Sequence, residues 1–76
     1  PLEMRLYPNP TNENYVIIQT NVSGIKEIEV FDLLGKKLID ISLNSKYLDI
    51  SKLNPGIYLL NISIANQSSL HKLIIQ

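Results

Sequence analysis

The fold is decided by residues 53–64, which read LNPGIYLLNISI. From Tyr58 onward every second residue is large and apolar, which is the period of a β-strand with one buried face. Pro55 fixes its own φ angle and Gly56 tolerates a chain reversal, so the pair predicts a sharp corner directly before the strand. Residues 53–64 therefore predict a corner that leads into a half-buried strand.

The same period of two recurs along the rest of the chain, in short apolar runs separated by turn residues, and helical periodicity is nearly absent. Seven strands are predicted, at residues 4–7, 15–20, 27–32, 39–43, 48–50, 58–64 and 70–75. Their spacing of about ten residues is typical of an antiparallel sandwich. We therefore predict an all-β fold, a seven-stranded antiparallel Ig-like or fibronectin-like β-sandwich. In such sandwiches a tyrosine at a corner sends its hydroxyl back to an upstream backbone group, and we expect this of Tyr58.

Two further turns are predicted between apolar runs. Asp32-Leu33-Leu34-Gly35 has Asp and Gly at the first and fourth positions of a type I turn. The Asp side chain can accept hydrogen bonds from turn amides, so this segment predicts a hairpin. Asn66-Gln67-Ser68-Ser69 is predicted to be the turn before the last strand.

The composition excludes several classes of protein. The chain has 76 residues, no cysteine, and seven basic and seven acidic side chains that give a net charge of zero. Disulfides and cysteine-based zinc sites are therefore excluded, and no basic stripe indicates a nucleic-acid partner. No apolar run approaches the roughly 20 residues that span a bilayer, so we predict no direct membrane insertion. One small domain is expected.

No pattern of catalytic or metal-binding residues emerges. His71 is the only histidine, and no nucleophile elbow supports a Ser–His–Asp triad. Glu27 and Glu29 share a strand face, which is expected to be solvated rather than to line a glycosidase cleft. The loop at residues 9–14 offers one carboxylate, too few for a typical calcium site. We predict no enzyme activity, no cofactor and no metal.

Four segments, in this order and spacing, resemble one known family: Leu6–Pro10, Val30–Lys36, Leu53–Tyr58 and His71–Ile75. The chain resembles the type A C-terminal sorting domains of cargo proteins exported by the type IX (Por) secretion system of Bacteroidetes-type bacteria. The resemblance extends from Leu6 to the last residue.

The resemblance implies a secretion signal rather than a catalyst. It implies a cargo domain N-terminal to this chain, transit through the periplasm, and recognition by the outer-membrane translocon. A sortase-like protease is then expected to remove the domain, leaving the cargo on the cell surface or secreted. The chain is expected to be a single sorting domain over residues 1–76, with residues 1–5 as a linker remnant.

Transferred to this sequence, the resemblance gives these translocon-recognition positions: Gly35, Lys36, Gly56, Tyr58, Leu70, Lys72, Ile74, Ile75 and Gln76. The fold alone would equally explain the two glycines and Tyr58. If Lys72 faces solvent, alternation places Leu70 and Ile74 beside it and directs Leu73 and Ile75 inward. Our hypothesis is that the translocon docks on this strand or its edge by strand addition; the alternative is that both strand faces are buried.

Other functions stay open at this point. One is a carbohydrate-binding or adhesive module, for which Tyr7, Tyr15 and Tyr47 are the candidate exposed aromatic residues, although they fall in separate strands or loops. Another is an inert spacer or assembly domain. Exposed strand edges also leave open a homodimer formed through an edge strand.

Overall fold

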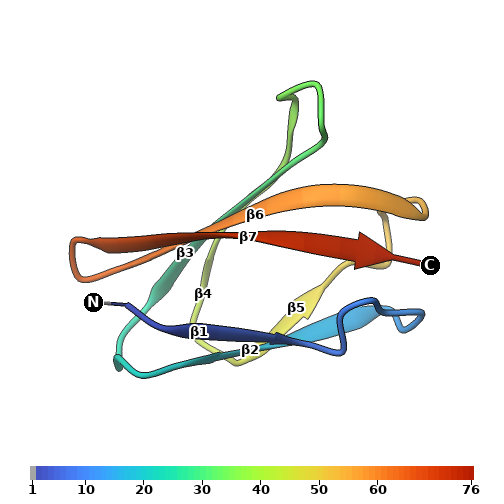
Figure 1. The fold of residues 1–76 in the computed structure, drawn as a ribbon. Coiled ribbons are helices and arrows are strands. Elements are labelled where there is room, and N and C mark those ends of the chain that lie inside the picture. The colour runs from blue at the N-terminus through green and yellow to red at the C-terminus, as the bar shows by residue number, and fades with distance from the viewer. Residues whose placement is uncertain (1) are drawn as a thin grey trace.

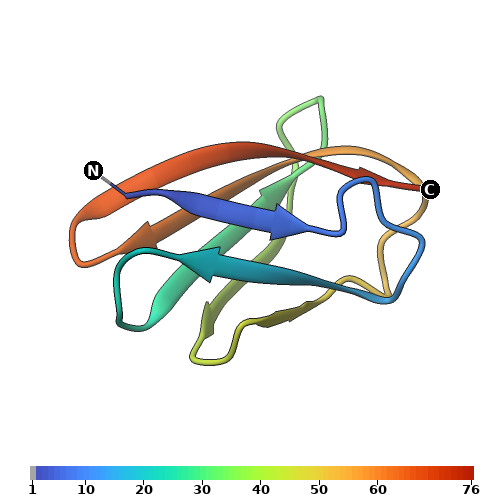
Figure 2. The same ribbon diagram turned by 60° about the horizontal axis from the view of Figure 1, so that its bottom comes forward.

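A computed structural model describes residues 2–76 as two packed β-sheets in which all strand pairs are antiparallel (Figure 1). A three-stranded sheet of order β1-β2-β5 lies against a four-stranded sheet of order β4-β3-β6-β7 (Figure 2). The strands are β1 (Met4–Tyr7), β2 (Tyr15–Thr20), β3 (Lys26–Phe31), β4 (Lys37–Leu43), β5 (Tyr47–Asp49), β6 (Gly56–Ile64) and β7 (Gln67–Ile75). Among the described residues, no helix is long and apolar enough to cross a membrane. The predicted seven-stranded antiparallel β-sandwich is confirmed.

Alternate residues of the strands fill the space between the two sheets. Along β6, every second side chain from Tyr58 to Ile64 is buried. The core consists of Met4, Val16, Ile18, Ile28, Val30, Leu48, Ile50, Tyr58, Leu60, Ile62, Ile64, Leu73 and Ile75. Most of these are β-branched residues or leucines, whose side chains pack well on a pleated surface.

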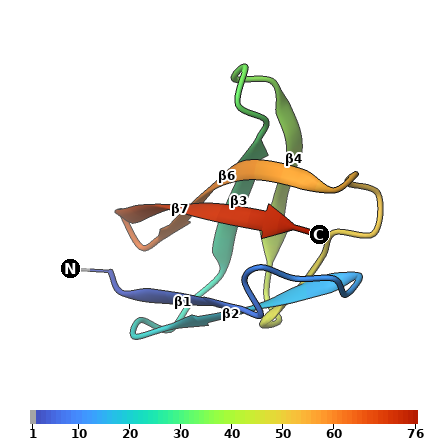
Figure 3. The ribbon, with the colours of Figure 1, turned by 45° about the vertical axis from the view of Figure 1, so that its right-hand side comes forward.

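The first predicted hairpin is confirmed and projects from the sandwich as an arm (Figures 1 and 3). The Asp32 carboxylate accepts hydrogen bonds from the amides of Leu34 and Lys36, both at 2.9 Å. Gly35 N donates to Asp32 O at 3.1 Å, and Gly35 has a φ of +90°, which disfavours any residue with a Cβ. Asp32 therefore belongs to the turn and not to the strand before it.

The predicted turn at residues 66–69 is wrong in position. Ile64 pairs with Gln67, so the connection is the two-residue segment Ala65-Asn66, and β7 already begins at Gln67. Ala65 and Asn66 have φ angles of +48° and +69°. Positive φ at both positions is the mark of the type I′ turn, whose twist matches that of the strands, and Asn accepts this conformation readily whereas Ala does so rarely. The polar side chains that follow belong to the strand.

The predicted linker at residues 1–5 begins at Pro1, which lies outside the described residues. Leu2 packs against the core, and Met4 and Arg5 are the first residues of β1. The strand therefore starts within the segment, and its assignment as a linker stays a prediction.

The corner before β6 is held by Tyr58, as expected. Its ring is buried, and its hydroxyl donates a hydrogen bond to the backbone oxygen of Asn54, four residues upstream.

Tyr58→Phe should therefore lower the free energy of unfolding by about 1 kcal/mol, the usual net value of one hydrogen bond. Urea unfolding would measure the change. Tyr47→Phe is the control, because the Tyr47 hydroxyl has no hydrogen bond among the described residues; equal effects of the two variants would contradict the prediction.

Candidate recognition surface

The last strand, β7, has one buried and one exposed face over its C-terminal half. Leu73 is fully buried and Ile75 is 8% exposed, so both belong to the core. Leu70 is 60% exposed, Lys72 is exposed and Ile74 is half-buried on the opposite face. The alternation predicted from Lys72 is thus confirmed, and the alternative with both faces buried is wrong. We call Leu70, Lys72 and Ile74 the outer row.

The outer row continues across the neighbouring strand. Ile74 opposes Ile57, and Lys72 opposes Leu59 in the antiparallel pairing of β6 with β7. Ile57 is 44% exposed, so apolar surface extends from β7 onto β6. The ammonium group of Lys72 forms no ion pair with any described residue. This part of the sheet therefore offers an apolar strip with one uncompensated positive charge.

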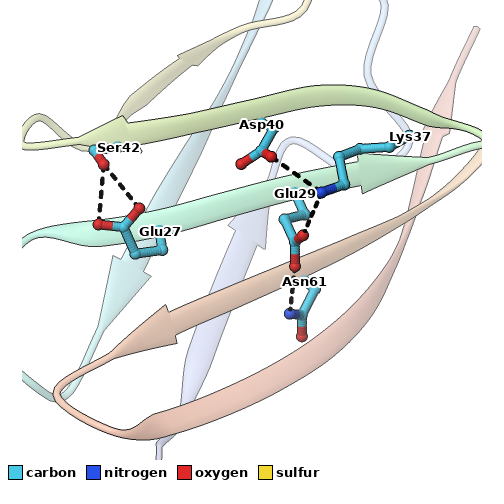
Figure 4. Close-up of polar contacts among 6 residues, drawn as sticks. All are labelled: Glu27, Glu29, Lys37, Asp40, Ser42 and Asn61. Carbon is cyan, nitrogen blue, oxygen red and sulfur yellow. Dashed lines mark hydrogen bonds and ion pairs between the residues drawn. The ribbon is translucent and has the colours of Figure 1, made fainter.

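The other part of the same sheet face is polar, and its side chains bind one another (Figure 4). Ser42 Oγ lies 2.9 and 2.7 Å from the two carboxylate oxygens of Glu27. Lys37 Nζ lies 3.0 Å from both Glu29 Oε2 and Asp40 Oδ2. Asn61 Nδ2 also donates to Glu29 at 3.3 Å. Glu27 and Glu29 are thus occupied by neighbours, in contrast to Lys72.

The network shifts two pKa values. Hydrogen bonds from Lys37 and then Asn61 lower the pKa of Glu29, and hydrogen bonds to Glu29 and Asp40 raise the pKa of Lys37. The contribution of Glu29 to stability is present above its ordinary pKa and is lost as the pH falls through the lowered value. That of Lys37 is present below its ordinary pKa and is lost as the pH rises through the raised value. Both groups are solvated, so the effect on stability is small.

Removing the lysine should show this coupling directly. In Lys37→Met the pKa of Glu29 is expected to rise, because the group that contributes most to lowering it is gone. A carboxyl-carbon NMR titration of Glu29 measures the midpoint. Lys46→Met is the matched control, since Lys46 lies over the Tyr47 ring, 5.6 Å from its centroid. An unchanged Glu29 midpoint in Lys37→Met would mean that the ion pair does not form in solution.

We call residues 72–76 the tail. Along the tail, a loop covers the edge of β7. Asn9 and Thr11, in the loop after β1, hydrogen-bond to Lys72, Ile74 and Gln76 along the side of β7 that faces away from β6. Strand addition at these residues would require displacement of the loop. The edge strands β1, β4 and β5, by contrast, are each paired with a single strand. The predicted edge-strand homodimer stays a prediction.

The structure brings some of the predicted recognition residues together and separates others. Gly56 pairs with Ile75 of β7. A Cβ at Gly56 would lie 3.7 Å from the Tyr58 ring. Gly56 and Tyr58 therefore form the corner that lies beside the end of β7. Gly35 and Lys36 lie on the projecting arm (Figure 3). The sequence therefore predicted two separate regions, the arm and the tail.

The tip of the arm carries two exposed apolar residues that the sequence analysis did not single out. Leu33 is 63% exposed and Leu34 is 97% exposed. Both occupy the central positions of the turn, where polar residues are usual.

The three candidate tyrosines lie closer together than their sequence positions suggested. Tyr7 and Tyr47 both oppose Ile17, on the two sides of β2. The rings of Tyr15 and Tyr47 meet edge to face, with centroids 5.8 Å apart. Arg5 lies 5.3 Å from the centroid of the Tyr7 ring. The strand order brings these residues together, and the sequence alone did not indicate that order.

Among residues 2–76, the candidate catalytic side chains form one serine–histidine pair. No group of three or more metal-binding side chains occurs within residues 2–76. Ser69 Oγ lies 2.8 Å from His71 Nε2, but no described carboxylate hydrogen-bonds to that imidazole. The pair lacks the third group that orients the histidine of a triad.

Comparison with known families identifies the chain as similar to a secretion family. The sequence profile of the family described as "Secretion system C-terminal sorting domain" matches residues 5–76. A comparison with curated proteins gives no match. The matched range includes both the tail and the loop that covers its edge.

Proposed function

Because the chain belongs to the family of type IX secretion system C-terminal sorting domains, we propose that the type IX machinery recognises it through the outer row of β7. Membership in the family makes the chain an export signal, which addresses a cargo protein to the cell surface or the medium. A signal of this kind acts by being recognised and not by catalysis.

The observation that supports the outer row is that it combines exposed apolar surface on β7 with a positive charge that has no ion pair among the described residues. Elsewhere on the same sheet face, Lys37 forms ion pairs with the carboxylates of Glu29 and Asp40. A partner that places a carboxylate opposite Lys72 and apolar side chains opposite Leu70 and Ile74 would be complementary. Protein interfaces gain specificity from such charge complementarity and affinity from buried apolar contacts.

The cargo is exported in three steps. The domain folds in the periplasm, the translocon binds it, and a sortase-like protease then cleaves the chain on the N-terminal side of β1. Met4 is buried and Leu2 packs partly buried against the core, which supports a cleavage point before them, since proteases need an extended and accessible backbone.

A reporter fusion tests the proposal. Residues 1–76 are placed behind a signal peptide and a fluorescent protein in a bacterium with a working type IX system. The fusion should reach the surface or medium, and the reporter without the domain should stay in the periplasm. Mass spectrometry of the exported reporter should find it without β1. Retention of the intact fusion would refute export by this domain, and export with the domain attached would refute removal alone.

The aromatic surface of the three-stranded sheet favours a second candidate function, a carbohydrate-binding module. Tyr15 and Tyr47 are 38% and 51% exposed, and tyrosine rings are suited to contact with sugars. Their edge-to-face packing and the Lys46 ammonium over Tyr47 leave less ring face free than a flat platform would. Saturable binding on a glycan array, lost in Tyr47→Ala, would support this function; no saturable binding would remove it.

A further inference from the structure

Two segments at opposite ends of the chain meet at the edge of β7. The Asn9 side chain donates from Nδ2 to Lys72 O at 2.8 Å, and its Oδ1 accepts from Ile74 N at 2.9 Å. One side-chain amide thus supplies the donor and the acceptor that the peptide group of a neighbouring strand would supply. In Figures 1 and 2 this loop runs beside the end of β7.

The backbone of Thr11 continues the pairing to the end of the chain. Thr11 N donates to Ile74 O at 2.9 Å, and Gln76 N donates to Thr11 O at 2.7 Å. Thr11 is 1% exposed, and its hydroxyl accepts from Glu13 N at 3.0 Å. Four hydrogen bonds therefore hold residues 72–76 to the loop. The loop is held in turn by the buried side chain of Thr11. We call Asn9 and Thr11 the tail clamp.

We propose that Asn9 is a positioning residue of the export signal, which keeps the tail in the extended form that presents the outer row. This inference rests on the proposed function. The last residues of a chain fray unless something ties them down. A partner that binds a frayed tail must order it at a cost in affinity, whereas a clamped tail is already ordered. Asn9 bonds the backbone of Lys72 and Ile74, two of the three outer-row residues.

The opposite role, a cover that the translocon displaces in order to add a strand, fits the structure less well. Leu73 and Ile75 alternate with the clamped residues and lie in the core. Pulling residues 72–76 into a new pairing would disturb these two side chains as well as the clamp. The two roles predict opposite signs: weakening the clamp lowers export if it positions the tail and raises export if it covers the edge.

The test uses Asn9→Ala and the nearly isosteric Asn9→Asp, each in the 76-residue chain and in the reporter fusion. Asn9→Asp keeps the acceptor for Ile74 N, but it replaces the donor to Lys72 O by a negatively charged oxygen that repels this carbonyl. Amide hydrogen exchange at Ile74 should accelerate about thirtyfold in Asn9→Ala, as expected for the loss of two hydrogen bonds worth about 1 kcal/mol each. Export should fall by a similar factor in Asn9→Ala and also fall in Asn9→Asp.

Asp49→Ala is the control, because it removes a local hydrogen bond to Ser51 N and none to the tail. When variants with the same loss of thermal stability are compared, the Asp49→Ala fusion should still be exported normally. Increased export in the Asn9 variants, normal export despite faster exchange, or an equal loss in Asp49→Ala would each overturn the inference. If Asn9→Ala does not fold, Asn9→Asp decides alone. Retention of an outer-row variant together with normal export of the Asn9 variants would refute the clamp and leave the proposed function standing.

Discussion

Leu73→Ala is expected to lower the free energy of unfolding by about 2–5 kcal/mol, the usual cost of truncating a buried leucine. Leu73 is fully buried on β7, where it opposes Tyr58. A domain of this length has about 4–11 kcal/mol of stability in all, so the variant should be close to unfolding at 37 °C. Thermal and urea unfolding followed by circular dichroism would measure the loss.

Lys72→Ala, one residue earlier, is the matched comparison. Its side chain is exposed and unpaired, so the free energy of unfolding should change by less than about 0.5 kcal/mol. Similar destabilisation by both substitutions would contradict the division of β7 into a core face and an outer face.

This contrast determines how the export signal must be mapped. Deleting residues 72–76 would remove Leu73 and Ile75 from the core together with the partners of Asn9 and Thr11. Such a deletion would block export whether the tail is recognised or only needed for folding. Substitutions confined to the outer row avoid this ambiguity because they leave the core and the backbone pairing intact.

Local pattern accounts for the parts of the fold that the sequence predicted correctly. Alternation from Tyr58 to Ile64 reflects a single strand with one buried face, and the turn at Asp32 depends on hydrogen bonds within five residues. The inward and outward faces of the tail followed from the same alternation. Each of these features is encoded by neighbours in the chain.

What the sequence did not reveal depends on contacts between distant residues. Asn9 lies 63 positions from Lys72, and nothing in either segment specifies their pairing. Tyr15 and Tyr47 meet only because β2 is next to β5 in the sheet. The turn before β7 was misplaced because Ala65, an unusual residue at positive φ, forms half of it. Strand order and pairing are set by the packing of the whole sandwich.

Substitution of the entire outer row is expected to abolish export without unfolding the domain. The variant Leu70→Thr, Lys72→Glu, Ile74→Thr removes the apolar surface and inverts the charge, while threonine retains a high preference for strands. Interface residues of this kind are often worth about 2 kcal/mol each, so the exported fraction should fall by about thirtyfold or more. Immunoblots of the reporter in periplasm, surface and medium measure it, and circular dichroism verifies the fold.

The matched control makes the same changes on the other sheet: Tyr15→Thr, Lys46→Glu, Tyr47→Thr. It has the same change in net charge and also replaces two hydrophobic side chains by threonine, but Tyr15 and Tyr47 lie on the three-stranded sheet and Lys46 lies in the loop directly before β5. Export of the control with retention of the outer-row variant would locate the recognised surface on β7, because general effects of charge or solubility would affect both. The reverse result would move the recognised surface to the tyrosines and would refute the outer row as the signal.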